Sequence, residues 1–147
     1  LMGSSDIDGD RQALVDAGLN SPPDKTLLKA RLLFDGGFYE EALLQLKSLN
    51  NETLTLPRER IEYTYRFARI YHKSGKTKEA IRSYSETLIQ GRDYPYYFAA
   101  NAALQLGIIY KSYGNKEKAA YYFRECLSLD YDEYHTSISQ KAMAGLS

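Results

Sequence analysis

Residues 106–127 read LGIIYKSYGNKEKAAYYFRECL, and this stretch decides the fold. On either side of Gly114, apolar residues recur at the three- and four-residue steps that define one face of an α-helix. A glycine just past a helix readily takes the left-handed conformation that ends the helix. The stretch therefore predicts a helix, a short turn at Gly114 and a second, antiparallel helix.

The same pattern occurs three times along the chain. Gly37, Gly75 and Gly114 stand 38 and 39 residues apart, and each is followed five residues later by an alanine. A small residue precedes each glycine by seven positions, and a large apolar residue follows each alanine by four. Small residues opposite large ones let antiparallel helices approach closely, with Tyr110 or Phe123 filling the space that Gly107 and Ala119 leave. A constant period with constant residue sizes indicates repeated structure.

This pattern predicts an all-α fold in one domain over residues 25–147, after a flexible or loosely packed segment over residues 1–24. The domain is expected to contain three helical hairpins, at about 25–54, 57–92 and 95–131, and a capping helix at 133–146. The individual helices are expected at 25–35, 38–49, 57–73, 77–90, 95–112, 116–129 and 133–146.

Composition narrows the classes of function. Nineteen Lys and Arg residues balance nineteen Asp and Glu residues, so no overall field attracts nucleic acid or anionic lipid. Neither a secretory signal nor a stretch apolar enough to span a membrane is visible, which leaves the compartment open and favours the cytoplasm. The single cysteine, Cys126, and two isolated histidines form no metal-ligand or catalytic motif. We therefore expect no enzymatic activity, cofactor, metal, nucleic acid or membrane insertion.

The three hairpins resemble the tetratricopeptide repeat, whose signature places small and aromatic residues in a fixed order. The matching residues, unit by unit, are Ala30, Leu33, Gly37, Tyr39, Ala42 and Leu46; Ala68, Tyr71, Gly75, Ala80, Tyr84 and Leu88; and Leu106, Gly107, Tyr110, Gly114, Ala119, Phe123 and Leu127. The chain departs from the signature in its longer period, in lacking the closing proline, and in having Thr26, Thr64 and Ala103 where the early tryptophan belongs. It is also similar to the C-terminal part of larger bacterial repeat proteins, so we expect a piece of a longer chain.

The resemblance implies an α–α superhelix whose first helices line a concave groove that holds a peptide or a partner protein. In that register the candidate partner-binding residues are Arg31, Phe34, Tyr65, Arg69, His72, Lys73, Asn101, Leu104 and Lys111. Between Arg58 and Arg82 eight basic residues stand against three acidic ones, which favours an acidic partner segment. Alternatively, the apolar candidates belong to the core and the cations form a solvated helix face.

The function expected from the sequence is therefore a protein or peptide interaction scaffold. Two other functions stay open. The chain could be an accessory domain of a larger enzyme or of a secretion or assembly factor, or it could be an RNA-binding helical repeat, against which its zero net charge counts. Self-association into a homo-oligomer also stays open.

Overall fold

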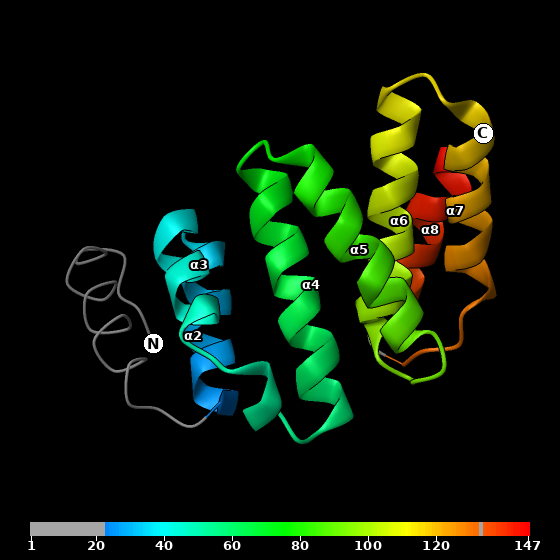
Figure 1. The fold of residues 1–147 in the computed structure, drawn as a ribbon. Helices are drawn as coiled ribbons and strands as arrows, with labels where there is room; N and C mark the ends of the chain where they lie inside the picture. Colours follow the sequence, from blue (N-terminus) through cyan, green and yellow to red (C-terminus); the bar gives the residue numbers. More distant parts are fainter. Residues whose placement is uncertain (1–22, 133) are drawn as a thin grey trace. The chain divides into compact units, whose positions relative to one another are not determined.

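The computed structural model describes residues 23–132 and 134–147 of the chain (Figure 1). The chain divides into two compact units, residues 1–76 and residues 77–147. The first unit contains α2 (Pro23–Asp35), α3 (Tyr39–Lys47), the 3-10 turn η1 (Asn51–Thr53) and α4 (Pro57–Lys73). The second unit contains α5 (Thr77–Gly91), α6 (Tyr97–Ser112), α7 (Lys116–Ser128) and α8 (His135–Leu146). The fold is an all-α helical repeat, as predicted.

The observed helix ends lie close to the predicted ones. None of the ends differs from its expected position by more than two residues, and α4 begins and ends where it was expected. The flexible segment predicted for residues 1–24 lies outside the described residues except for Pro23 and Asp24, which begin α2. The boundary between the units follows Lys76, inside the second predicted hairpin, so each unit is described by itself.

Three turns that follow α2, α4 and α6 share one geometry. Gly37, Gly75 and Gly114 have φ values of +85°, +78° and +78°, the left-handed region predicted for them. After Gly114, the backbone N–H of Asn115 donates to the Tyr110 carbonyl oxygen at 2.9 Å, and the other two turns have the equivalent bond at the same length. This bond satisfies a carbonyl group that a helix end otherwise leaves without a partner. A side chain with a Cβ atom would strain the backbone here, which explains why glycine ends these helices.

The core of the first unit lies among its three α-helices. Helix α3 packs on α2, and α4 packs on both (Figure 1). The core residues are Leu27, Ala30, Leu33, Ala42, Leu46, Leu54 and Ile70, and Phe34, Tyr63 and Phe67 pack partly buried against them. These positions recur with helical spacing, so each helix buries one apolar face.

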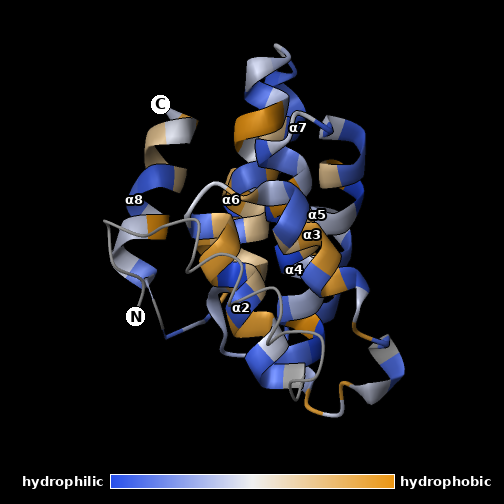
Figure 2. Cartoon of the chain, turned by 90° about the vertical axis from the view of Figure 1, so that its left-hand side faces the viewer, coloured by the Kyte–Doolittle hydropathy of each residue, from blue (hydrophilic) through white to orange (hydrophobic). Residues whose placement is uncertain are grey.

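Helix α6 is the centre of the second unit. It packs against α5, α7 and α8, and Figure 1 shows it between α5 on one side and α7 and α8 on the other. Its buried residues lie on most of its circumference, from Phe98 to Ile109, and many of them are alanines. A helix that is apolar nearly all round is enclosed by its neighbours. Helix α7 is different, because its buried residues are only Ala119, Phe123 and Cys126. Figure 2 shows hydrophobic and hydrophilic residues mixed along the helices.

One aromatic ring holds α6, α7 and α8 together. Phe123 on α7 is 1% exposed. A Cβ atom added to Gly107 on α6 would lie 2.5 Å from this ring, and one added to Gly145 on α8 would lie 2.4 Å from it. The predicted pairing of Phe123 with Gly107 is thus confirmed, and Gly145 is a second contact that the repeat pattern did not reveal.

Candidate partner-binding site

A cation and an aromatic ring from two helices meet in the first unit. The Arg69 guanidinium of α4 lies over the Phe34 ring of α2, with 5.5 Å between its Cζ atom and the ring centroid. The ring itself is held by the core cluster and by Tyr39, whose ring centroid is 5.4 Å away. A guanidinium stacked on a ring presents its N–H groups at its edge, where a carboxylate can accept two hydrogen bonds. The pair therefore places a cationic group beside an apolar ring.

His72 and Lys73 occupy the last turn of α4, close to Arg69. The pKa of His72 is lowered from its ordinary value, first by burial and then by the charges of Arg69 and Lys73. Both charges act on His72, which follows Arg69 by three residues and precedes Lys73 by one. Cations at the C-terminal end of a helix interact favourably with its dipole, which offsets part of their mutual repulsion. This end of α4 is therefore a cluster of two cations, Arg69 and Lys73, with His72 between them in the sequence.

Three further cations of α4, Arg58, Arg60 and Arg66, also contact groups within the protein. Glu62 accepts from Arg66 at 3.0 Å and from Arg58 at 3.3 Å. Arg60 donates to two backbone carbonyl groups, those of Leu54 and Thr55. Sequence reasoning counted all of these cations toward the basic patch. The four-residue spacing of Glu62 from its two partners is the signal that could have identified these ion pairs beforehand.

Tyr65 is buried beside the ion pair of Arg66 and Glu62. The Arg66 side chain is only 8% exposed, and its guanidinium lies 5.1 Å from the centroid of the Tyr65 ring. Tyr65 itself is 3% exposed. The expectation that Tyr65 faces a partner does not fit this burial, because helix position alone did not reveal which neighbours cover it. The buried Tyr65 and Arg66 side chains therefore contact other groups of the protein itself.

Arg31 is the remaining candidate of the first unit. Its Nε atom lies 3.9 Å from the Asp35 carboxylate, and both side chains are about half exposed, at 46% and 56%. An exposed pair at this distance contributes little to stability, on the order of 0–1 kcal/mol. Arg31 can therefore exchange this partner for another carboxylate at small cost.

Three candidates, Asn101, Leu104 and Lys111, lie on α6 in the second unit. Leu104 is 1% exposed and belongs to the core, as the alternative interpretation of the sequence had it. Asn101 is half-buried, whereas Lys111 is exposed and donates from Nζ to the Gly145 carbonyl oxygen of α8 at 3.0 Å. The structure thus places Phe34 and Arg69 side by side in the first unit. Asn101, Leu104 and Lys111 lie in the second unit.

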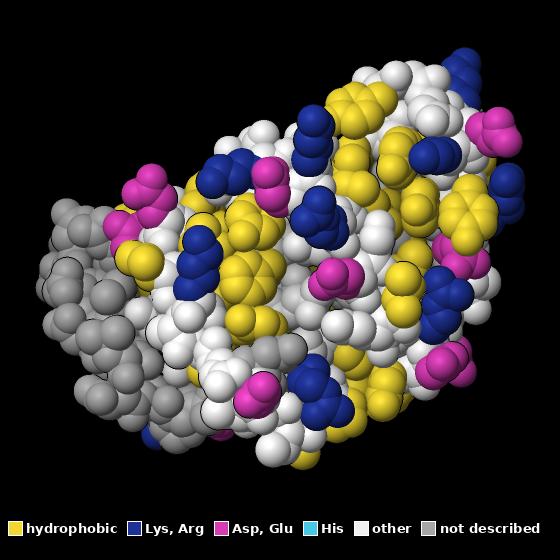
Figure 3. Space-filling view, in the orientation of Figure 1, with side chains coloured by type: hydrophobic (Ala, Val, Ile, Leu, Met, Phe, Trp, Pro, Cys, Tyr) yellow, Lys and Arg dark blue, Asp and Glu magenta, His cyan; other side chains and the backbone are white. Residues whose placement is uncertain are grey.

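The one cysteine of the chain lies outside this cluster, and the described residues also include possible metal ligands. Cys126 is buried, and burial raises the pKa of its thiol to about 11. Across residues 23–132 and 134–147, no three His, Cys, Asp or Glu side chains are grouped so that they could hold a metal ion. On the face drawn in Figure 3, Lys and Arg side chains lie beside hydrophobic ones, with Asp and Glu interspersed.

The length and hydropathy of the described helices bear on membrane insertion. Among the described residues, none of the helices combines the length and the hydropathy that crossing a bilayer requires. The longest of these helices, α4, has 17 residues and carries several charges.

Comparison with known proteins gives one match. A family model described as tetratricopeptide repeat matches residues 60–132, from α4 to the loop after α7. No curated protein and no solved structure matches the chain. The matched region includes two of the three left-handed glycine turns, at Gly75 and Gly114.

Proposed function

Through residues 60–132 this chain belongs to the tetratricopeptide repeat family, and on that premise we propose that it is an interaction scaffold whose α2–α4 face binds an acidic segment of a partner protein. Repeats of this family generally mediate protein–protein interaction, and the family is typically a non-catalytic scaffold. By the α2–α4 face we mean Arg31, Phe34, Arg69, His72 and Lys73.

The observation that supports this assignment is the stacking of Arg69 on Phe34, with Lys73 and the imidazole of His72 beside it in the last turn of α4. Arginine and an aromatic ring together supply the two contacts that contribute most at protein interfaces, a directional charge and a rigid apolar surface. Because the core holds Phe34, the ring loses little conformational freedom when a partner binds. An acidic residue next to an apolar one would use both contacts.

The charge balance of α4 supports an acidic partner specifically. Arg58 and Arg66 share the Glu62 carboxylate, and Arg60 serves backbone carbonyl groups, so these three cations have structural roles. Arg69 and Lys73 form the cationic end of the helix, and His72 adds a charge when it is protonated. An acidic segment would relieve the repulsion within this cluster, whereas a basic one would increase it.

Binding of a labelled acidic peptide to the whole chain tests this function. The peptide alternates glutamate with leucine, and fluorescence anisotropy measures its affinity. Replacing Arg69 and Lys73 together, as Arg69→Gln with Lys73→Gln, is expected to weaken binding by at least about tenfold, because two charge contacts are lost. The affinity of the wild-type chain should also fall as salt is raised.

The matched control removes two exposed lysines of the same unit, as Lys25→Gln with Lys47→Gln. It changes the net charge by the same amount but leaves the α2–α4 face intact. We expect it to alter affinity by less than about twofold. An equal loss in both double variants would mean that only long-range attraction acts, and the assignment to Arg69 and Phe34 would be wrong. Failure of the wild-type chain to bind the peptide would reject the acidic-partner hypothesis altogether.

A further inference from the structure

Two loops lie side by side at one end of the second unit. One connects α5 to α6, and the other connects α7 to α8. The backbone N–H of Asp132 in the second loop donates to the Pro95 carbonyl oxygen of the first at 3.2 Å. The Tyr97 ring of α6 also packs edge-to-face with the Tyr134 ring, with 4.9 Å between their centroids. These contacts bring residues from distant parts of the sequence onto one surface.

A row of tyrosine rings runs along these loops. Tyr94 and Tyr96 stack with 5.9 Å between their centroids and 8° between their planes. The ring of Phe98, which is buried, contacts both Tyr96 and Tyr97, with centroids 6.4 Å and 4.5 Å away. Tyr94 and Tyr134 are 38% and 55% exposed, and the two tyrosines between them are half-buried. We call Tyr94, Tyr96, Tyr97 and Tyr134 the tyrosine edge. Because its rings pack on one another, they lose little conformational freedom when a partner binds.

Tyr134 has an uncommon backbone conformation. Its φ value is +60°, in the left-handed region that residues other than glycine seldom adopt. It precedes α8 as the N-cap residue, but its side chain makes no capping hydrogen bond. Neither the backbone nor the start of α8 therefore requires a tyrosine at this position.

The loops beside the tyrosine edge carry an excess of negative charge. Asp93, Asp130 and Asp132 are exposed, and none of them forms an ion pair with another described residue. Arg92, the basic residue of the first loop, lies 3.5 Å from the Glu125 carboxylate of α7. The three aspartates therefore keep their charges available to a partner.

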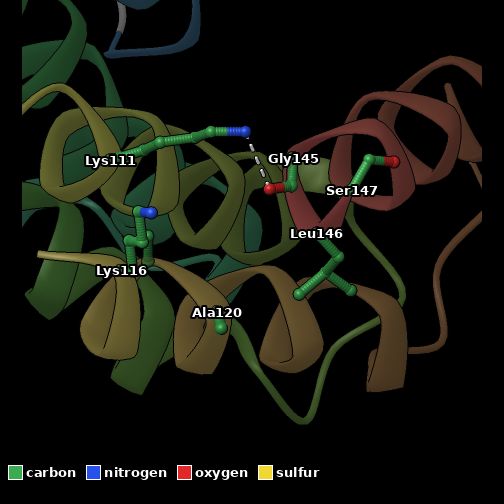
Figure 4. A pocket seen from close by; sticks show the side chains of 7 residues that line it. Lys111, Lys116, Ala120, Gly145, Leu146 and Ser147 are labelled. Atoms are coloured by element: carbon green, nitrogen blue, oxygen red, sulfur yellow. Dashed lines mark hydrogen bonds between the residues drawn. The ribbon is translucent and has the colours of Figure 1, made fainter. Parts of the chain in front are cut away.

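Two cations of α6 and α7 lie at the other end of the unit. Figure 4 shows the pocket at that end, where Lys111 donates to the Gly145 carbonyl oxygen and Lys116 lies nearby. Helix α6 has 16 residues, so its ends are about 24 Å apart, well beyond the screening length of about 8 Å at physiological ionic strength. Arg124 of α7 is closer to the loops, but one cation leaves three aspartates with a net negative charge.

We propose that the tyrosine edge binds an arginine-containing segment of a partner protein. A guanidinium is planar and weakly hydrated, so it stacks on an aromatic ring while its N–H groups donate to carboxylates beside that ring. The chain already contains one such stack, that of Arg69 on Phe34. An acidic segment would be repelled by the aspartates, and a purely apolar one would leave them without a counter-charge. This charge preference is opposite to that of the α2–α4 face, so a different partner segment is required.

Binding of a labelled arginine peptide to the whole chain tests the proposal. The peptide has three arginines separated by glycine and serine, and a second peptide has lysine in their place. Fluorescence anisotropy measures both affinities. We expect the arginine peptide to bind at least about threefold more tightly, because the lysine ammonium group is more strongly hydrated and does not stack. Equal affinities would mean that only charge attraction acts, and the proposal would be wrong.

One pair of variants tests the rings. Tyr134→Gly removes an exposed ring and introduces the residue best suited to the left-handed backbone, so the protein should stay folded. We expect it to weaken arginine-peptide binding by about threefold. The matched control is Tyr121→Ala, because Tyr121 is 53% exposed and also packs edge-to-face on one tyrosine ring, that of Tyr122. The control should leave the affinity unchanged.

A second pair of variants tests the charges. Asp130→Asn with Asp132→Asn should weaken binding by about tenfold, because two charge contacts are lost. The matched control, Glu79→Gln with Glu117→Gln, removes the same charge from the first turns of α5 and α7, at the opposite ends of these helices from the loops. We expect the control to alter affinity by less than about twofold. Circular dichroism verifies that each variant is folded.

The remaining outcomes are distinguishable. An equal loss in the control variants, or no binding of the arginine peptide at concentrations up to about 1 mM, overturns the proposal. Sedimentation velocity of the chain alone tests a second copy as the occupant: a dimer that Tyr134→Gly dissociates would assign the tyrosine edge to self-association instead. Arg69→Gln with Lys73→Gln should leave arginine-peptide binding unchanged, so the tyrosine edge and the α2–α4 face can fail independently.

Discussion

Replacing Gly107 with alanine should destabilise the second unit, because the new methyl group would collide with a ring that has no room to move. The added Cβ atom would lie 2.5 Å from Cε1 and 2.6 Å from Cδ1 of Phe123. Carbon atoms in contact normally stay about 3.5–4.0 Å apart. Moving the ring away is obstructed, because its other atoms already lie against the backbone of Gly145.

Two opposing effects set the magnitude. Overpacking a close-packed core costs about 1–3 kcal/mol, and the blocked ring places this site at the upper end. Alanine is a better helix former than glycine by about 1 kcal/mol, which acts in the opposite direction. The expected net loss in unfolding free energy is about 2 kcal/mol, or about 4–8 °C in Tm for a chain of this length.

Urea unfolding followed by far-UV circular dichroism and tyrosine fluorescence measures this loss. The combined variant Gly107→Ala with Phe123→Leu is the decisive partner, because leucine leaves room for the methyl group. We expect the two substitutions to be coupled by about 1–2 kcal/mol, so that the pair costs less than the sum of its members. A Gly107→Ala protein more stable than the wild type, or strictly additive costs, would falsify the contact between Phe123 and Gly107.

Three further predictions concern a buried ion pair, a histidine whose pKa is lowered and a buried thiol. Glu62→Gln should cost about 3 kcal/mol in chemical denaturation, because it removes the charge of the Glu62 carboxylate, which lies 3.0 Å from the buried Arg66 guanidinium; a loss below about 1 kcal/mol would contradict the burial. Burial and neighbouring cations lower the pKa of His72, so the unfolded state binds that proton more tightly and stability falls as pH drops below about 6.5. His72→Gln should therefore lose less stability than the wild type between pH 7.5 and pH 5, and parallel curves for the two proteins would refute this. Burial raises the pKa of Cys126 to about 11, so a thiol reagent at pH 8 should label the protein only after unfolding; rapid labelling of the native protein would show that the thiol is accessible.

Sequence reasoning predicted the helices well but the candidate site only partly. It placed Arg69, His72 and Lys73 on the groove face of the second hairpin, and the charges of Arg69 and Lys73 act on His72 by lowering its pKa. It also counted Tyr65 and Leu104 among the candidate partner-binding residues, although both are buried. Helical spacing gives the direction in which a side chain points, but whether that direction is covered depends on the neighbouring helices.

The sequence by itself determined the hairpins, because each helix and turn depends on residues close together in the chain. The left-handed glycine at Gly114 and the apolar spacing on both sides of it are local properties. Because they are repeated at Gly37 and Gly75, the pattern can be recognised in the sequence. Tertiary structure alone decided how Phe123 fits between Gly107 and Gly145 and how Lys111 reaches a carbonyl group 34 residues further along the chain. Such contacts depend on how separate helices pack, and the packing sets both the space and the partners that each side chain finds.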